Sequence, residues 1–303
     1  MWYVCVFVCT AGSVIKTIST GNWVHGVTSV GDELFVLLQR DANQVAVYSI
    51  NDYQLLRPIQ LRELKHCYFM TSCVRHKCLY MSDEDNKYIH RYDLSSGPSK
   101  VITPVKRFTD KRISKWSVPG KPRGLSVTPG SCNLLVACWE DDKSCKLVEL
   151  RAERGQVVRE ITLQSDITDL HHAVQLTIGQ YVVCHGDINT LHRVCMVDAA
   201  GIVTRNYGCE RGSGVGQLNN PRHLAVDEDS QSIFVADCLN HRVVLLSPML
   251  EFVREFSEGV SDPWRLYFHN TTNTTQRLFV GNSYGDVAVI ELHTSRVCNQ
   301  THQ

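Results

Sequence analysis

The sequence predicts an all-β fold, a closed six-bladed β-propeller with four antiparallel strands in each blade. The first observation is a short apolar strand core that recurs six times in 303 residues, at intervals of 45 to 55 residues. This interval is the length of one four-stranded blade. The second observation is that a polar turn and another apolar strand follow every core. The third is that residues 13–19 read as a fourth strand without a blade of its own, which can complete the last unit and remove its exposed edge.

The repeated unit is clearest in residues 212–256. A glycine-rich connection leads into Pro221, which begins a strand because proline has no amide hydrogen to donate within one. Residues 224–226 and 233–235 are apolar and flank a polar break, which predicts an antiparallel pair. Residues 242–246 and 251–256 supply a third and a fourth strand, separated by a turn at Ser247 and Pro248.

The same unit recurs along the whole chain, which we interpret as a single domain of residues 1–303. The six cores are Leu34-Phe35-Val36, Leu79-Tyr80-Met81, Leu134-Leu135-Val136, Tyr181-Val182-Val183, Ile233-Phe234-Val235 and Leu278-Phe279-Val280. The blades are expected at residues 22–65, 66–118, 119–167, 168–216, 217–260 and 261–303, the last completed by residues 10–20. Residues 2–8 read as an additional strand outside this repeat.

The composition indicates the cellular location of the protein and the kinds of partner that it binds. The formal net charge is zero, so the composition predicts no general electrostatic attraction to nucleic acid or to an anionic membrane. The 13 cysteines form no Cys-x-x-Cys pair, and most alternate with apolar residues, which indicates reduced, buried thiols and a cytoplasmic protein. The apolar run at residues 2–8 is too short to span a bilayer and follows no positive charge, so we expect neither a signal peptide nor a membrane partner.

Two motifs in the clearest blade resemble a known repeat family. Residues 214–222 read Gly-x-Gly-x-Leu-Asn-x-Pro-Arg, and residues 235–243 read Val-Ala-Asp-x-x-Asn-His-Arg-Val. Both resemble the NHL repeat, whose six-bladed propellers form the carboxy-terminal part of tripartite-motif ubiquitin ligases. The resemblance implies an NHL-type propeller that selects protein or RNA targets. The chain has no RING or B-box pattern of cysteine and histidine, so ligase activity does not carry over to it.

A candidate recognition site emerges when the six first strands are aligned on their partners. The position just before each strand is cationic, potentially cationic or aromatic, and the next position is cationic or potentially cationic in three blades. The residues are His25, Tyr68, Arg123, His171, Arg222 and Trp264, followed by His172, His223 and Arg265. Because the first strand of a blade is innermost, these side chains should surround one mouth of the central channel. Guanidinium groups beside aromatic rings suit a peptide or stacked bases. The alternative is that these residues cap the channel and pack against neighbouring blades.

We therefore expect a monomeric, non-enzymatic recognition propeller without a cofactor, which binds a protein partner through this face as the substrate-recognition part of a ubiquitin ligase system. One alternative is single-stranded RNA binding by the same face. A second is a metal-dependent lyase or lactonase, which would need His25, His171 and His223 to converge, although Arg123 and Arg222 would place positive charge beside the ion. The sequence contains no nucleophile elbow, phosphate loop or paired-carboxylate motif. The lysines and arginines of residues 100–115 are a further candidate surface on the opposite face.

Overall fold

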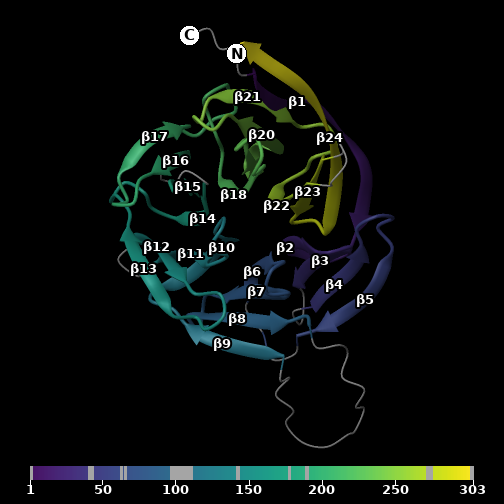
Figure 1. The fold of residues 1–303 in the computed structure, drawn as a ribbon, viewed down its shortest axis with the longest axis vertical. Coiled ribbons are helices and arrows are strands. Elements are labelled where there is room, and N and C mark those ends of the chain that lie inside the picture. Colours follow the sequence, from purple (N-terminus) through teal and green to yellow (C-terminus); the bar gives the residue numbers. More distant parts are fainter. Residues whose placement is uncertain are drawn as a thin grey trace, which may run out of the picture.

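The protein is a ring of six four-stranded antiparallel sheets around a central channel (Figure 1). The computed structural model describes the whole chain except residues 1–2, 40–43, 62–63, 65–66, 96–111, 141–143, 177–178, 188–190, 271–275 and 301–303, and except the side chains of residues 3–10 and 294–300. Most of the basic segment at residues 100–115 lies outside the described residues. No described helix is long and apolar enough to cross a membrane. The predicted six-bladed propeller is confirmed.

Each blade runs outward from the channel in chain order. The first three blades are β2 (Trp23–Val30), β3 (Glu33–Gln39), β4 (Gln44–Ser49) and β5 (Leu55–Gln60); β6 (Cys67–Cys73), β7 (Cys78–Asp83), β8 (Tyr88–Asp93) and β9 (Ile113–Ser117); and β10 (Lys121–Val127), β11 (Leu134–Trp139), β12 (Cys145–Leu150) and β13 (Val157–Thr162). The next two are β14 (Leu170–Gln175), β15 (Tyr181–His185), β16 (Arg193–Val197) and β17 (Val203–Tyr207); and β18 (Pro221–Val226), β19 (Ile233–Asp237), β20 (Arg242–Leu246) and β21 (Phe252–Phe256). A 3-10 turn, η1 (Cys238–Asn240), lies between β19 and β20.

The last blade joins the two ends of the chain. It contains β22 (Pro263–Asn270), β23 (Gln276–Asn282) and β24 (Asp286–Gln300), and β1 (Tyr3–Ser19) forms its outer edge. This pairing confirms the predicted closure by the terminal strands. The separate strand expected at residues 2–8 is instead the first half of β1, because β24 continues past Leu292 and pairs with it as far as Tyr3 and Gln300.

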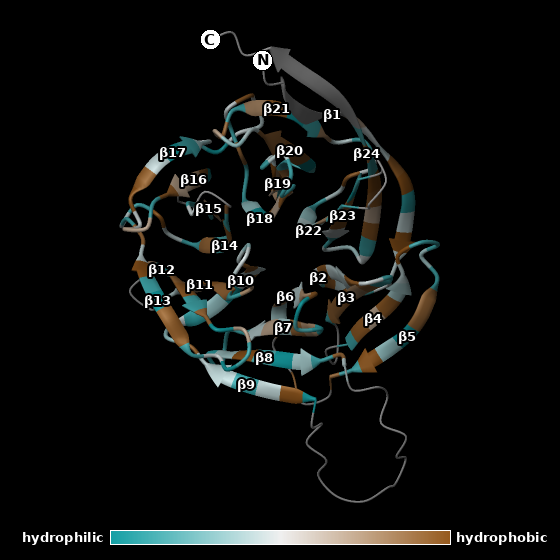
Figure 2. Ribbon diagram, viewed as in Figure 1, coloured by the Kyte–Doolittle hydropathy of each residue, from teal (hydrophilic) through white to brown (hydrophobic). Residues whose placement is uncertain are grey.

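The core lies between neighbouring blades. Val182 and Val194 of the fourth blade pack against Leu224 and Val235 of the fifth, and similar apolar clusters join the other pairs of blades. Hydrophobic residues accordingly recur in strands around the whole ring (Figure 2). Since alternate residues of a strand face opposite sides of its sheet, each blade contributes to two such clusters.

The burial of the described cysteines predicts how fast their thiols react. Ten are free, eight of these are buried, and Cys209 is exposed. Burial raises the pKa of Cys184 and of Cys195 to about 12, so their reactive thiolates are scarce at neutral pH. We expect Cys209 to react rapidly with a thiol reagent in the native protein, and the buried thiols to react only after denaturation. A Cys209→Ser variant should lose one fast equivalent in a stopped-flow labelling experiment, and an unchanged fast phase would contradict the exposure of Cys209.

Candidate functional site

Four of the predicted recognition residues form a contiguous aromatic and cationic arc where the first strands begin. The His25 ring lies 5.7 Å from the Tyr68 ring and 6.1 Å from the Trp264 ring, measured between centroids. The guanidinium carbon of Arg222 lies 5.3 Å from the centre of the Trp264 ring. The β2, β6, β18 and β22 strands therefore bring these side chains together across sequence separations that no local pattern shows.

Arg123 lies elsewhere on this mouth and already has a partner. Its guanidinium lies over the Trp139 ring at 4.7 Å, and its Nε lies 3.3 Å from Glu84 Oε1. The same carboxylate oxygen accepts a hydrogen bond from Trp139 Nε1 at 2.9 Å. Glu84 and Trp139 were missed from the sequence, because they come from the connection after β7 and from the end of β11 rather than from a first strand.

Arg265 lies one layer deeper and closes the channel. Only 3% of it is exposed. It donates hydrogen bonds to the backbone carbonyls of His25, Trp264 and Tyr68 at 2.7 to 2.8 Å, and its guanidinium lies 3.8 Å from the centre of the Phe69 ring. Burial, followed by the nearby charge of Arg222, lowers the pKa of Arg265 to about 9. Arg265 therefore ties three blades together rather than facing a partner.

The histidines of this layer are neutral. The rings of His172 and His223 stack with their centroids 3.9 Å apart. His172 Nδ1 accepts the Leu224 N–H, so its proton is on Nε2, which donates to the Leu125 carbonyl. Burial lowers the pKa of His172 to about 4, and lowers the pKa of His223 well below its ordinary value. Near pH 7 these rings are packing groups without charge.

His25 and His171 are also buried and neutral near pH 7. Burial, followed by the charge of Arg265, lowers the pKa of His25 to about 3, and burial lowers the pKa of His171 well below 6.5. The nine predicted residues thus divide into two groups. His25, His171, His172, His223 and Arg265 are buried, whereas Tyr68, Arg123, Arg222 and Trp264 are partly exposed. Recognition by side-chain contact is available to the second group, and the packing alternative describes the first.

Four further apolar side chains are exposed around this mouth, and none of them belongs to the nine predicted residues. The exposed fractions are 60% for Trp23, 78% for Val215, 45% for Leu239 and 66% for Tyr284. Trp23 begins β2, Val215 lies in the connection that leads into β18, and Leu239 and Tyr284 lie in turns between second and third strands. These segments are tied to one another by backbone hydrogen bonds such as Leu239 N–H to the Asn219 carbonyl. Trp23 could have been found from the sequence, because it lies two residues before the predicted site residue His25.

The Asn-His-Arg triplet supports the blade from inside. The buried carboxylate of Asp237 accepts hydrogen bonds from Asn219 N–H, Asn240 Nδ2 and Arg242 Nε at 2.6 to 2.8 Å. Arg242 also donates to the carbonyls of Ser213 and Gln217. These contacts hold the glycine-rich connection that precedes β18. A third contact reaches the next blade, because the ring Nδ1 of His241 accepts the backbone N–H of Asp262.

Among the described residues, no group of three or more His, Cys, Asp or Glu side chains is arranged to hold a metal ion. His25, His171 and His223, the ligands required by the lyase or lactonase alternative, are buried in the layers described above.

Comparisons with known proteins show the architecture of the chain. No protein-family model matches it, and no curated protein matches it. Among solved structures, it resembles a protein of unknown function from Bacteroides caccae at 13% identity with a TM-score of 0.58, covering 88% of this chain and 94% of that one. It also resembles Kuenenia stuttgartiensis hydrazine synthase at 15% identity with a TM-score of 0.60, covering 91% and 97% of the two chains. These likenesses show the fold alone.

Proposed function

We propose that this propeller is a non-enzymatic recognition module that binds a protein partner through the channel-mouth face, the surface formed by Trp23, Val215, Leu239 and Tyr284 around the arc of Tyr68, Arg222 and Trp264. The observation that carries the proposal is the exposure of these four apolar side chains beside a partly buried arginine and two aromatic rings. Protein interfaces are enriched in aromatic residues and arginine, and their strongest contacts are commonly Trp, Tyr and Arg.

The NHL resemblance extends this proposal to the biological setting. We propose an NHL-type propeller that serves as the substrate-recognition part of a tripartite-motif-like ubiquitin ligase system in the cytoplasm. The structural role of Asp237, Asn240 and Arg242 supports this kinship, because it gives the shared motif a physical reason to exist. The buried free thiols support a reducing compartment.

Protein is favoured over single-stranded RNA by the charge of this face. The buried histidines are neutral near pH 7, and Glu84 pairs with Arg123. Within the arc the positive charge is that of Arg222, with the buried Arg265 beneath it, whereas affinity for nucleic acid depends mainly on contacts between phosphates and many cationic side chains.

A double variant, Trp23→Ala with Tyr284→Ala, tests the proposed face. Both side chains are exposed, so we expect the free energy of unfolding to change by less than about 0.5 kcal/mol per site. Partner affinity should fall by at least about tenfold, because truncated hot-spot residues cost about 1 to 2 kcal/mol each. Partners are first identified by affinity purification and mass spectrometry, and their dissociation constants are then measured by calorimetry with the parent and with the variant.

The matched control is Leu55→Ala with Met249→Ala, which removes exposed apolar side chains from β5 and from the turn after β20. This control should retain the partner. Loss of the partner in the control but not in the Trp23 and Tyr284 variant would overturn the assignment of the face. Tight, strongly salt-dependent binding of random single-stranded RNA, abolished by the same double variant, would favour the RNA alternative.

A further inference from the structure

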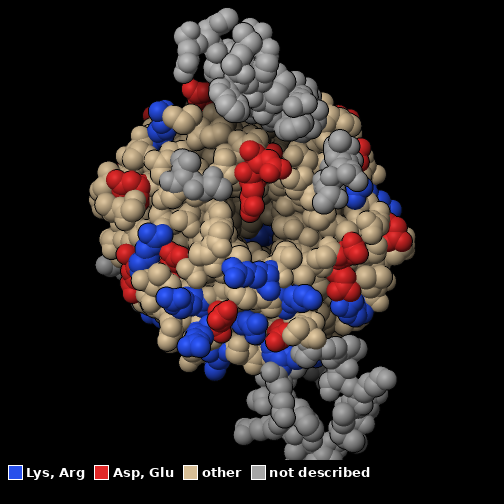
Figure 3. Space-filling model, viewed as in Figure 1, with Lys and Arg blue, Asp and Glu red and all other residues tan. Residues whose placement is uncertain are grey.

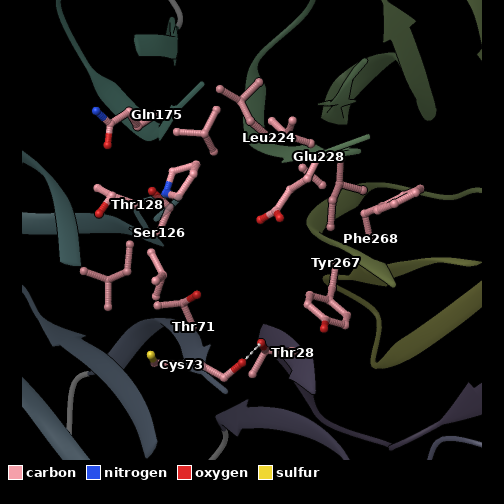
Figure 4. Close-up of a pocket in the computed structure, with 18 of the residues that line it drawn as sticks. Thr28, Thr71, Cys73, Ser126, Thr128, Gln175, Leu224, Glu228, Tyr267 and Phe268 are labelled. Carbon is pink, nitrogen blue, oxygen red and sulfur yellow. Dashed lines mark hydrogen bonds between the residues drawn. The ribbon is translucent and has the colours of Figure 1, made fainter. Parts of the chain in front are cut away.

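A second candidate site lies at the other end of the channel, on the far side of the His172 and His223 layer. It is a cavity of about 620 Å³, and residues near the ends of all six first strands line it (Figure 4). This volume is typical of a pocket for a small molecule. One lining residue from each strand is Thr28 of β2, Thr71 of β6, Ser126 of β10, Gln175 of β14, Ala225 of β18 and Tyr267 of β22. Since the layer of Arg265, His172 and His223 separates the two mouths, this cavity is distinct from the channel-mouth face.

Hydroxyl groups dominate the polar part of the lining. Ser72 donates to the Ser29 carbonyl at 2.8 Å, and its oxygen lies 2.7 Å from the Thr28 hydroxyl (Figure 4). The Tyr267 hydroxyl lies 2.7 Å from Ser29 Oγ. Each hydroxyl has one donor hydrogen and two acceptor lone pairs, so a hydroxyl that is paired with another can still accept a hydrogen bond from a ligand.

Ser126 carries the clearest sign of a missing partner. Its Oγ is buried at the cavity wall, and no described residue forms a hydrogen bond with it. A buried hydroxyl without a hydrogen-bond partner destabilises the folded state, so such a group in a native protein needs a physical explanation. A ligand that donates to this oxygen or accepts from it supplies one.

The charges around the cavity are of both signs. Glu228 extends into the space (Figure 4), and it is the one carboxylate among the described lining residues. Acidic atoms also lie beside the central opening in the view onto this face (Figure 3). At the deep end, the positive charge of the buried Arg265 acts on the rings of His172 and His223, which line the cavity. The guanidinium of Arg75 also lines the cavity, so the described lining carries one acidic and one basic side chain and favours neither an anion nor a cation.

We propose that this cavity binds a neutral, polyhydroxylated ligand the size of a monosaccharide or disaccharide. Sugar hydroxyls match the donor and acceptor groups of Thr28, Thr71 and Ser126, and the C–H faces of a sugar match the apolar walls formed by Leu125 and Leu224. This ligand site is additional to the partner-binding face proposed above, and neither depends on the other.

The test measures sugar binding by the full chain and by a Ser126→Ala variant. The probes are the methyl glycosides of glucose, galactose, mannose and N-acetylglucosamine, together with maltose, cellobiose, glucosamine and glucuronic acid. Saturation-transfer NMR detects binding, and calorimetry gives the dissociation constants. We expect at least one neutral sugar to bind, and Ser126→Ala to weaken it about three- to tenfold, the range for one lost hydrogen bond. The melting temperature of Ser126→Ala should not fall, because the substitution removes a hydroxyl without a protein partner.

Two further variants keep the outcome decisive. Ser82 also has a buried hydroxyl without a partner, but it does not line the cavity, so Ser82→Ala should leave sugar affinity unchanged. Glu228→Gln should retain the neutral sugar and improve the binding of glucuronic acid, since it removes the negative charge at the mouth. The proposal is overturned if no neutral sugar binds, if glucosamine or glucuronic acid binds the parent more tightly than every neutral sugar, or if Ser82→Ala weakens binding as much as Ser126→Ala.

Discussion

Lowering the pH from 7.5 to 5.5 should reduce the free energy of unfolding by at least about 4 kcal/mol. Burial lowers the pKa of His25 to about 3 and the pKa values of His172 and His185 to about 4. In the unfolded chain these rings return to a pKa of about 6.5. Below that value the unfolded state binds more protons than the folded state, so stability is lost as the pH falls. Each ring contributes about 1.4 kcal/mol over this interval, and these three rings contribute about 4 kcal/mol. Burial also lowers the pKa values of His171 and His223 well below 6.5, so these rings add to the loss.

Urea denaturation at the two pH values measures this loss, and His25→Phe isolates the contribution of one ring. Neither ring nitrogen of His25 has a hydrogen-bond partner among the described residues, so an apolar ring of similar shape should be tolerated at pH 7.5. This variant should lose about 1.4 kcal/mol of the pH dependence, the contribution of one ring. His293→Phe, at an exposed position, is the matched control for replacing a histidine with phenylalanine. Equal stability of the parent at pH 7.5 and 5.5 would show that these histidines are accessible to protons in the folded state.

The fold was predictable because its signals are local and repeated. Alternation around the cores at Phe35, Leu135 and Phe234 marks each second strand, and the spacing between cores counts the blades. The two ends were harder to interpret. Residues 3–8 belong to β1, but the strand that pairs with them ends at Gln300, and no local pattern links segments so far apart.

The sequence predicted which residues lie at the channel mouth, but not which of them are buried. Strand register identified the position of Arg222 and Trp264 at the mouth, and the structure places them in contact. Register does not show which side chains turn toward the axis, so the burial of Arg265 beneath its neighbours was not foreseen. It also does not show that Glu84, from the turn after β7 of the preceding blade, pairs with Arg123. Both properties depend on packing between blades.

Replacing Arg242 with Ala should destabilise the protein by about 3 to 5 kcal/mol, the cost of breaking a buried ion pair by removing one partner. The substitution leaves the fully buried carboxylate of Asp237 without its cation, and it removes the donors that hold the carbonyls of Ser213 and Gln217. Val215 lies within the same connection, so this variant should also weaken partner binding at the channel-mouth face when measured below its melting temperature.

Two comparisons separate the loss of the ion pair from a general effect of removing arginine. Arg205→Ala, at an exposed position on β17, should change the free energy of unfolding by less than about 0.5 kcal/mol. A double variant, Arg242→Met with Asp237→Asn, removes both charges, so it should be less destabilised than Arg242→Ala alone. If the double variant is instead the less stable of the two, the hydrogen bonds to the connection matter more than the buried charge. If Arg242→Ala costs no more than Arg205→Ala, the Asn-His-Arg motif does not support the blade, and its arginine is then available for contact with a partner.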